Sequence, residues 1–130
     1  MDETGPLTAK VMQYQDTVRQ LVPTVKTAED WAPLASLIAI DRFERIGTFL
    51  EVHNWQQYAE MLTGWAHSID SFETTVRRVS EVTDLVYFEI EERHFFGGNA
   101  QAHVVNSMTV FEFDSDAKIC HVAVYLQQAA

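Results

Sequence analysis

Two residues that can exchange protons at neutral pH, Glu92 and His94, lie where an apolar strand pattern continues along the chain. In the stretch 85–96, even positions such as Phe88 and Ile90 are apolar, while positions 89, 91 and 93 are charged. A period of two is typical of a β-strand with one buried face, and Glu92 and His94 share the parity of that face. A carboxyl and an imidazole buried together can act as general acid and base, because burial shifts their pKa values toward the working range.

A glycine-rich turn signal, Gly97-Gly98-Asn99, separates this strand from a second strand-like run at 102–113. Dense β-branched and aromatic residues on both sides of such a turn predict a long β-hairpin. If the loop holds an even number of residues, the odd positions of the second strand join the inner face, and His103 lies within cross-strand reach of His94 and Glu92. A bulge would turn every side chain over. We therefore predict a catalytic trio, and the alternative is a solvated pair at the wet end of the hairpin.

Charged residues elsewhere supply further candidates for the site. Residues 41–45 hold four charged side chains within an expected first strand at 39–49, and alternate members of a strand must point the same way. One pair is expected to enter the site, so Arg45 or Glu44 would orient an oxygenated substrate. The alternative for Arg45 and for Glu44 is a salt bridge on the outer face of the strand. His53 is a fourth catalytic candidate, and its alternative role is a helix cap or a surface residue.

Helices and strands must position these residues. Apolar residues recur at spacings of three and four in the first half of the chain, which predicts helices at 7–25 (ending near Pro23), 30–38 and 54–67. Beyond about residue 70 the period becomes two, which predicts strands at 72–79, 85–96, 102–113 and 118–126. This order predicts an α+β fold, with the helices packed on one face of a curved antiparallel sheet.

Composition limits the class of protein. A chain of 130 residues suits a single domain, residues 1–130, with one core. Its formal net charge of −10 argues against nucleic acid and anionic membrane surfaces as partners. The acidic first residues lack the apolar core of a signal sequence, and no run approaches the roughly 18 apolar residues of a spanning helix. Because Cys120 is the single cysteine, we expect a soluble, cytoplasmic protein.

The element order resembles the nuclear transport factor 2-like superfamily, a cone-shaped α+β fold that includes SnoaL-like polyketide cyclases and ketosteroid isomerase. The stretch from Asp30-Trp31 to Ile40-Asp41 is similar to the short helix of that fold and its first strand. Residues 110–119, followed by 122–125, are similar to its final hairpin and last strand. The resemblance implies a pocket between the helices and the concave face of the sheet, and a homodimer.

We expect the pocket to be apolar and rich in aromatic residues, and so to bind a hydrophobic small molecule. Its predicted lining comprises Val86, Phe88, Ile90, Val105, Thr109 and Phe111 from the sheet, with Tyr58, Met61 and Leu62 from a helix. No metal site is expected, since no HxxxH or CxxC spacing supports one, and no cofactor is expected. An open sheet would otherwise leave Tyr87, Val104, Met108 and Val110 exposed on its outer face, which also favours a homodimer.

A small pocket with acids and histidines but no cofactor can move a proton α to a carbonyl, with an oxyanion stabilised meanwhile. The predicted function is therefore a cofactor-independent isomerase or cyclase of secondary metabolism, acting on a polyketide-like or polycyclic carbonyl compound. Glu92, His94, His103 and His53 are its catalytic candidates. The alternatives are a dehydratase in the same pocket, or a non-catalytic module for small-molecule binding or dimerisation.

Overall fold

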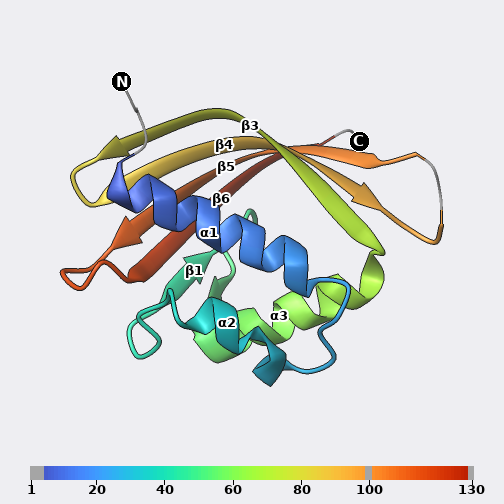
Figure 1. The fold of residues 1–130 in the computed structure, drawn as a ribbon, viewed down its shortest axis with the longest axis horizontal. Helices are drawn as coiled ribbons and strands as arrows, with labels where there is room; N and C mark the ends of the chain where they lie inside the picture. Colours follow the sequence, from blue (N-terminus) through green and yellow to red (C-terminus); the bar gives the residue numbers. More distant parts are fainter. Residues whose placement is uncertain (1–4, 99–100, 129–130) are drawn as a thin grey trace.

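Three helices lie on one side of a curved, open sheet in this computed structural model, which describes residues 5–98 and 101–128 (Figure 1). The expected α+β class is confirmed. In chain order the elements are α1 (Pro6–Leu21), the 3₁₀ turn η1 (Ala28–Trp31), α2 (Ala32–Ala35), β1 (Glu44–Ile46), β2 (Val52–His53), α3 (Trp55–Ser68), β3 (Ser71–Val82), β4 (Leu85–Phe95), β5 (His103–Phe113) and β6 (Ile119–Gln128).

The sheet has six strands in the order β2-β1-β6-β5-β4-β3, and the predicted antiparallel meander forms its larger part, β3 to β6. The whole sheet is mixed, however, because β1 runs parallel to β6, with Glu44 opposite His121. The chain passes through α3 and the meander before it reaches β6, so no tight turn forces the two strands to be antiparallel. The first strand is also shorter than the expected 39–49, because the chain turns at Gly47 into the partner strand β2.

The register of the β4–β5 hairpin matches the predicted parity. His94 pairs with His103, and Glu92 pairs with Val105, so the even positions of β4 and the odd positions of β5 share the inner face. Gly97 and Gly98 have φ values of 56° and 71°, the left-handed region that glycine adopts without a steric cost. Asn99, the third residue of the predicted turn, lies outside the described residues.

Helix α3 begins at a reciprocal cap and covers the inner face of the sheet. The Asn54 side chain accepts a hydrogen bond from the backbone of Gln57 at 2.8 Å, and the Gln57 side chain accepts one from the backbone of Asn54 at 2.9 Å. The fully buried Trp31 ties η1 to this helix, because its Nε1 donates to Thr63 Oγ1 at 3.0 Å. Within the described chain, no helix is long and apolar enough to cross a membrane.

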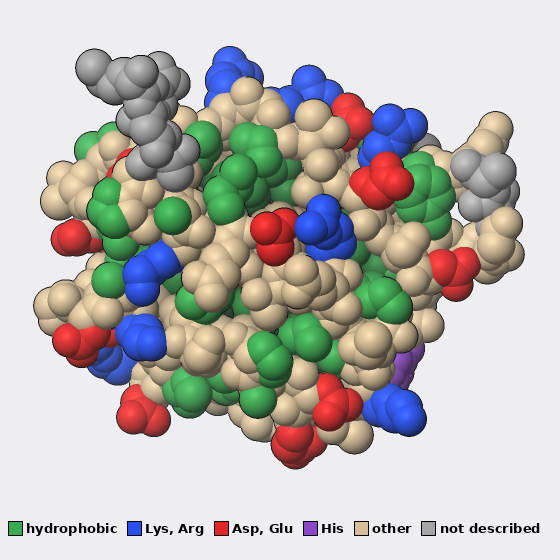
Figure 2. Space-filling view, viewed as in Figure 1, with side chains coloured by type: hydrophobic (Ala, Val, Ile, Leu, Met, Phe, Trp, Pro, Cys, Tyr) green, Lys and Arg blue, Asp and Glu red, His purple; other side chains and the backbone are tan. Residues whose placement is uncertain are grey.

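The molecular surface mixes the two signs of charge. On the face shown in Figure 2, acidic and basic side chains lie interspersed among apolar ones. The excess of acidic residues is therefore not gathered into one area of this face. Figure 2 has the orientation of Figure 1, so this face belongs to the side on which α1 is seen.

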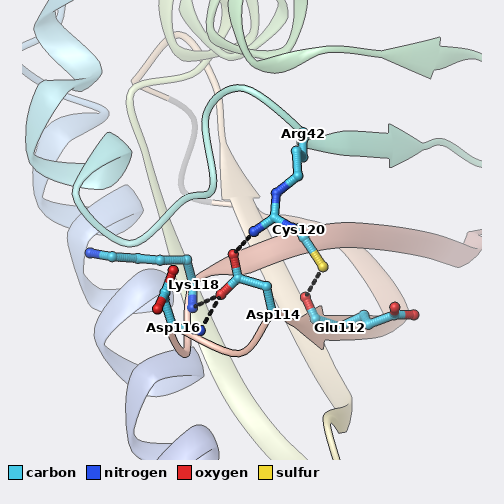
Figure 3. Close-up of polar contacts among 6 residues, drawn as sticks. All are labelled: Arg42, Glu112, Asp114, Asp116, Lys118 and Cys120. Carbon is cyan, nitrogen blue, oxygen red and sulfur yellow. Dashed lines mark hydrogen bonds and ion pairs between the residues drawn. The ribbon is translucent and has the colours of Figure 1, made fainter.

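Asp114 closes the turn between β5 and β6 (Figure 3). Its Oδ1 accepts the backbone N–H groups of Lys118 at 3.0 Å and Asp116 at 2.9 Å, and its Oδ2 accepts a hydrogen bond from Arg42. These donors lower the pKa of Asp114, with the Lys118 backbone as the largest cause. The turn thereby fixes where β6 begins, and β6 supplies one wall of the cavity described below.

We expect the Asp114→Asn variant to melt at a lower temperature than the wild type near pH 7, because the amide keeps the shape and loses the stabilised charge. Since the folded-state pKa is lowered, this stabilisation is complete above the ordinary value of 3.8 and is lost as the pH falls through the folded-state value. In thermal melts, the difference in melting temperature between the two proteins should therefore be constant well above pH 3.8 and shrink below it. A difference that does not change below pH 3.8 would contradict this assignment, and Asp116→Asn is the control.

Candidate active site

A cavity of ≈ 420 Å³ lies between the helices and the inner face of the sheet. Helices α1 and α3 form one wall, and β4, β5 and β6 form the other. Apolar side chains dominate the lining, as predicted. Twelve residues predicted from the sequence line it: Arg45, Tyr58, Met61, Leu62, Phe88, Ile90, Glu92, His94, His103, Val105, Thr109 and Phe111.

Glu92 and His94 form a hydrogen-bonded pair in this cavity. His94 Nε2 lies 3.1 Å from Glu92 Oε1, and only 13% and 19% of the two side chains are exposed. The His94 ring packs against Trp65 and Phe72, with ring centroids 5.8 and 6.1 Å apart. These aromatic contacts fix the imidazole, so the carboxylate is held at Oε1 and keeps Oε2 free to face a ligand.

His103 lies beside this pair at the exposed rim of the cavity. Its ring centroid is 6.3 Å from that of His94, and its Nε2 lies 3.4 Å from Gln128 Oε1. The structure thus brings the predicted trio together, although only Glu92 and His94 share a hydrogen bond. Within residues 5–98 and 101–128, no group of three or more His, Cys, Asp or Glu is placed to hold a metal ion. The prediction of chemistry without metal or cofactor remains a prediction.

The site contains a hydrogen-bonded pair of buried tyrosines that was not predicted: Tyr58 was expected to line the pocket, whereas Tyr14 was not among the expected site residues. The hydroxyl of Tyr14, on α1, is hydrogen-bonded to that of Tyr58, on α3, and the two residues are only 5% and 6% exposed. Tyr14 packs edge-on against Phe111, and Tyr58 stacks on Phe43. From the sequence, Tyr14 was one apolar position of a helix. Its hydroxyl was the available signal, because a buried tyrosine needs a polar partner.

The two phenols are neutral hydrogen-bond donors at neutral pH. Burial is the largest cause that raises the pKa of each, and Tyr58 raises the pKa of Tyr14 further. The Glu92 carboxylate also raises both pKa values, and the Arg45 guanidinium lowers both, so both charges act on the pair. One hydroxyl donates to the other, and the accepting hydroxyl keeps its own proton for a third group. The described residues supply no acceptor for that proton.

Arg45 and Glu44 point to opposite sides of β1. Arg45 lines the cavity, with its guanidinium carbon 5.3 Å from the centroid of the Tyr58 ring. Glu44 Oε1 instead lies 3.2 Å from His121 Nε2, outside the cavity, which corrects the expectation that it could meet a substrate. His53 does not line the cavity either. Its Nδ1 accepts a hydrogen bond from Arg45 at 3.4 Å, so His53 helps to position the Arg45 side chain.

One residue that was predicted to line the pocket does not do so. Val86 is fully buried in the core and is not part of the cavity wall. Trp65, on α3, forms part of that wall beside His94.

Ser107 adds a polar atom in the middle of the apolar wall. It lies on β5 between Val105 and Thr109, and its buried Oγ has no hydrogen-bond partner among the described residues. A buried hydroxyl without a partner costs stability, because it has lost its water and gained nothing in return. The hydroxyl is therefore a further point at which a ligand in the cavity can form a hydrogen bond.

We expect Ser107→Ala to keep or raise the free energy of unfolding, by up to about 1 kcal/mol, because the lost hydroxyl has no partner. Urea denaturation of the ligand-free protein measures this. The control is Thr63→Val, which should be less stable, because Thr63 Oγ1 accepts from Trp31 and donates to the Ala59 carbonyl. A clear loss of stability in Ser107→Ala would show that its hydroxyl is already satisfied.

Solved structures of other proteins share this arrangement over nearly the whole chain. An NTF2-like protein from Anabaena variabilis matches with a TM-score of 0.75 and 18% identity, over 99% of this chain and 96% of that one. An LEH-like epoxide hydrolase from M. tuberculosis matches with a TM-score of 0.67 and 16% identity, over 94% and 86%. A candidate SnoaL-like polyketide cyclase from Shewanella denitrificans matches with a TM-score of 0.68 and 10% identity, over 89% of each chain.

These matches establish the fold: the chain has the nuclear transport factor 2-like fold, as the resemblance in its sequence implied. Identities of this size carry no activity from one protein to another, because this fold supports unrelated functions. No protein-family model and no curated protein sequence matches the chain. The function must therefore be argued from the residues in the cavity.

Proposed function

We propose that the protein is a cofactor-independent isomerase or cyclase that transfers a proton on an apolar carbonyl compound, of the polyketide-like or polycyclic kind. One observation carries this proposal. A carboxylate held by an imidazole and a phenol pair with one free O–H line the same apolar cavity. Such a cavity has a base for a C–H proton and a neutral donor for the oxygen on which negative charge develops.

In the proposed reaction, Glu92 removes the proton α to the substrate carbonyl through Oε2, while His94 holds Oε1. The free O–H of the Tyr14–Tyr58 pair donates to the carbonyl oxygen, and its hydrogen bond strengthens as that oxygen becomes an enolate. Burial keeps both phenols protonated, because it raises their pKa values. Glu92 then returns the proton to a different carbon, which completes an isomerisation. Alternatively, the enolate carbon attacks a second carbonyl of the same molecule and closes a ring, and the alkoxide formed from that carbonyl takes the proton back from Glu92.

Two alternatives use the same cavity. A dehydratase would need a group that protonates a leaving hydroxyl, and His94 could supply that proton. A non-catalytic module for binding small molecules would need the apolar lining but not a carboxylate beside a free phenol proton. The desolvated charge and hydroxyls therefore favour catalysis, because a binding module gains nothing from the cost of burying them. The fold is shared with proteins named as a polyketide cyclase and an epoxide hydrolase, which is consistent with an enzyme.

We expect the protein to accelerate exchange of the α-protons of bicyclic ketones such as 2-tetralone with deuterated water, followed by proton NMR. Glu92→Gln and His94→Ala should each lower the catalysed exchange rate on the order of a hundredfold or more, since both change the base. Tyr14→Phe should lower this rate about a hundredfold, since it removes an oxyanion donor. Glu112→Gln, an exposed residue on the outer face, should change nothing.

Circular dichroism should show that each of these variants is folded. No acceleration on any ketone of the series, or full activity in all three cavity variants, would contradict the proposed proton transfer. If activity survives only in Tyr14→Phe, the result would support the assigned base and contradict the oxyanion role of the phenols.

We also propose that two copies pair through the outer face of the sheet. Val104 and Tyr125 are 43% and 61% exposed there, beside a hollow of ≈ 220 Å³. Asn106 lines this hollow, and its Oδ1 is buried without a partner among the described residues. Exposed apolar side chains beside a buried polar atom that lacks a donor are typical of an interface between subunits.

We expect light scattering coupled to gel filtration to show a dimer for the wild type and a monomer for Tyr125→Asp, because a buried charge opposes association at an apolar interface. Phe49→Asp is the matched control. It also removes an exposed aromatic residue, which is 81% exposed at the β1–β2 turn, away from the outer face. A monomeric wild type, or dissociation by both variants alike, would exclude the outer face as the interface.

A further inference from the structure

We propose that the substrate is a carboxylic acid whose carboxylate binds Arg45. This inference rests on the proposed function, because it assigns the class of molecule that the same cavity takes. Arg45 is the single Lys or Arg among the described residues that line the cavity, and Glu92 is the single Asp or Glu. The cavity therefore holds one fixed charge of each sign, and their positions decide which ligand fits.

The two charges lie at opposite ends of the cavity. Arg45 is opposite Val122 on β6, whereas Glu92 is in the row of Val105 and Gln128. Six residues of β6 separate these rows, which corresponds to roughly 20 Å of backbone at about 3.3 Å per residue. No carboxylate in the described part of the chain lies within ion-pair distance of Arg45. The guanidinium therefore makes no direct ion pair, although the Glu51 carboxylate at the β1–β2 turn lies near its Nη1.

Most of the N–H donors of Arg45 are available to a ligand. The structure gives the guanidinium one hydrogen bond, from Nη1 to His53 Nδ1 at 3.4 Å, and a cation–π contact with the Tyr58 ring. The other donors have no hydrogen-bond acceptor among the described residues, and the side chain is only partly buried. A ligand that fills the cavity would exclude solvent from these donors, so it must supply acceptors for them.

This requirement selects the chemical class of the ligand. A neutral hydrocarbon at this end would leave the other N–H donors of the guanidinium without an acceptor, which costs free energy. A carboxylate meets the planar guanidinium with two parallel hydrogen bonds and also neutralises its charge. A doubly charged group such as a phosphate would exceed the single cation present, in a protein whose formal net charge is already −10.

The charges also set the direction in which the acid binds. Glu92 at the far end repels a carboxylate, so the acid group lies at Arg45 and the apolar body extends toward Glu92. Between the two ends lies the Tyr14–Tyr58 pair, on which both Arg45 and Glu92 act. The reacting carbonyl would lie at these phenols, and the C–H bond that breaks would lie beyond it, at Glu92. The substrate class is therefore an apolar acid that carries a carbonyl group away from its carboxylate.

The test compares 2-naphthoate with 2-naphthamide, which has the same shape and no charge, by isothermal titration calorimetry. We expect the wild type to bind the acid at least about tenfold more tightly than the amide, since hydrogen bonds to a charged group are worth about 1.5–3 kcal/mol. Arg45→Met should remove this preference and leave the amide affinity within about threefold, and Arg45→Lys should retain part of it. Arg93→Met is the control for the loss of one positive charge, because Arg93 lies exposed on the outer face.

The outcomes separate this inference from the proposed function. Equal affinities for acid and amide in the wild type, or an acid preference that survives in Arg45→Met, would overturn the role of Arg45 and leave the proton-transfer site intact. An acid preference lost in both Arg45→Met and Arg93→Met would also overturn it, because net charge would then be the cause. If neither probe binds, the inference fails, while the proton-exchange assay on neutral ketones still tests the proposed function.

Discussion

The register between β4 and β5 decides which chemistry the cavity can contain. His94 lies opposite His103 and Glu92 opposite Val105, so an acid and an imidazole face the helices together with Phe88 and Ile90. A slip by one residue would turn the outer row of charged side chains inward and send this pair to the solvent. The apolar residues of the same rows prevent such a slip, because it would expose them. The same strand register therefore buries the hydrophobic core and places the polar pair in the cavity.

The helices then determine what the inward-facing strand residues meet. Tyr14 comes from α1 and Tyr58 from α3, and their hydrogen bond joins the two helices directly above the sheet. A hydroxyl pair in an apolar site keeps its protons, since burial raises both pKa values, and it leaves one proton for a ligand. In the proposed mechanism, the donor therefore depends on helix packing and the base on strand register, and neither feature alone would supply both groups.

The parts of this site that are periodic in the sequence could be predicted, and the parts that depend on distant contacts could not. Alternation placed Glu92, His94 and His103 on one face, because the side-chain period of a strand is fixed. Tyr14 and Tyr58 are separated by 44 positions and meet only through the packing of two helices, which no local pattern encodes. The sequence also left Arg45 and Glu44 open, because β1 has three residues and is too short to show an alternation. The parallel pairing of β1 with β6 was missed because the two strands are joined by a long stretch of chain, and no turn between them indicates their relative direction.

Several polar groups of this cavity are not fully satisfied by the protein. The free proton of the phenol pair and the buried Oγ of Ser107 have no partner among the described residues, and the Arg45 guanidinium has a single hydrogen bond there, to His53. Such groups cost stability in the ligand-free state. A fold selected for stability alone would replace them with apolar side chains of similar size, as at Val105 and Phe111 on the same wall. Because polar groups without partners are expected where a protein must bind something else, their concentration here points to a ligand with several oxygen atoms on an apolar frame. A purely hydrocarbon ligand would contact the apolar lining but would form no hydrogen bond with any of these three groups.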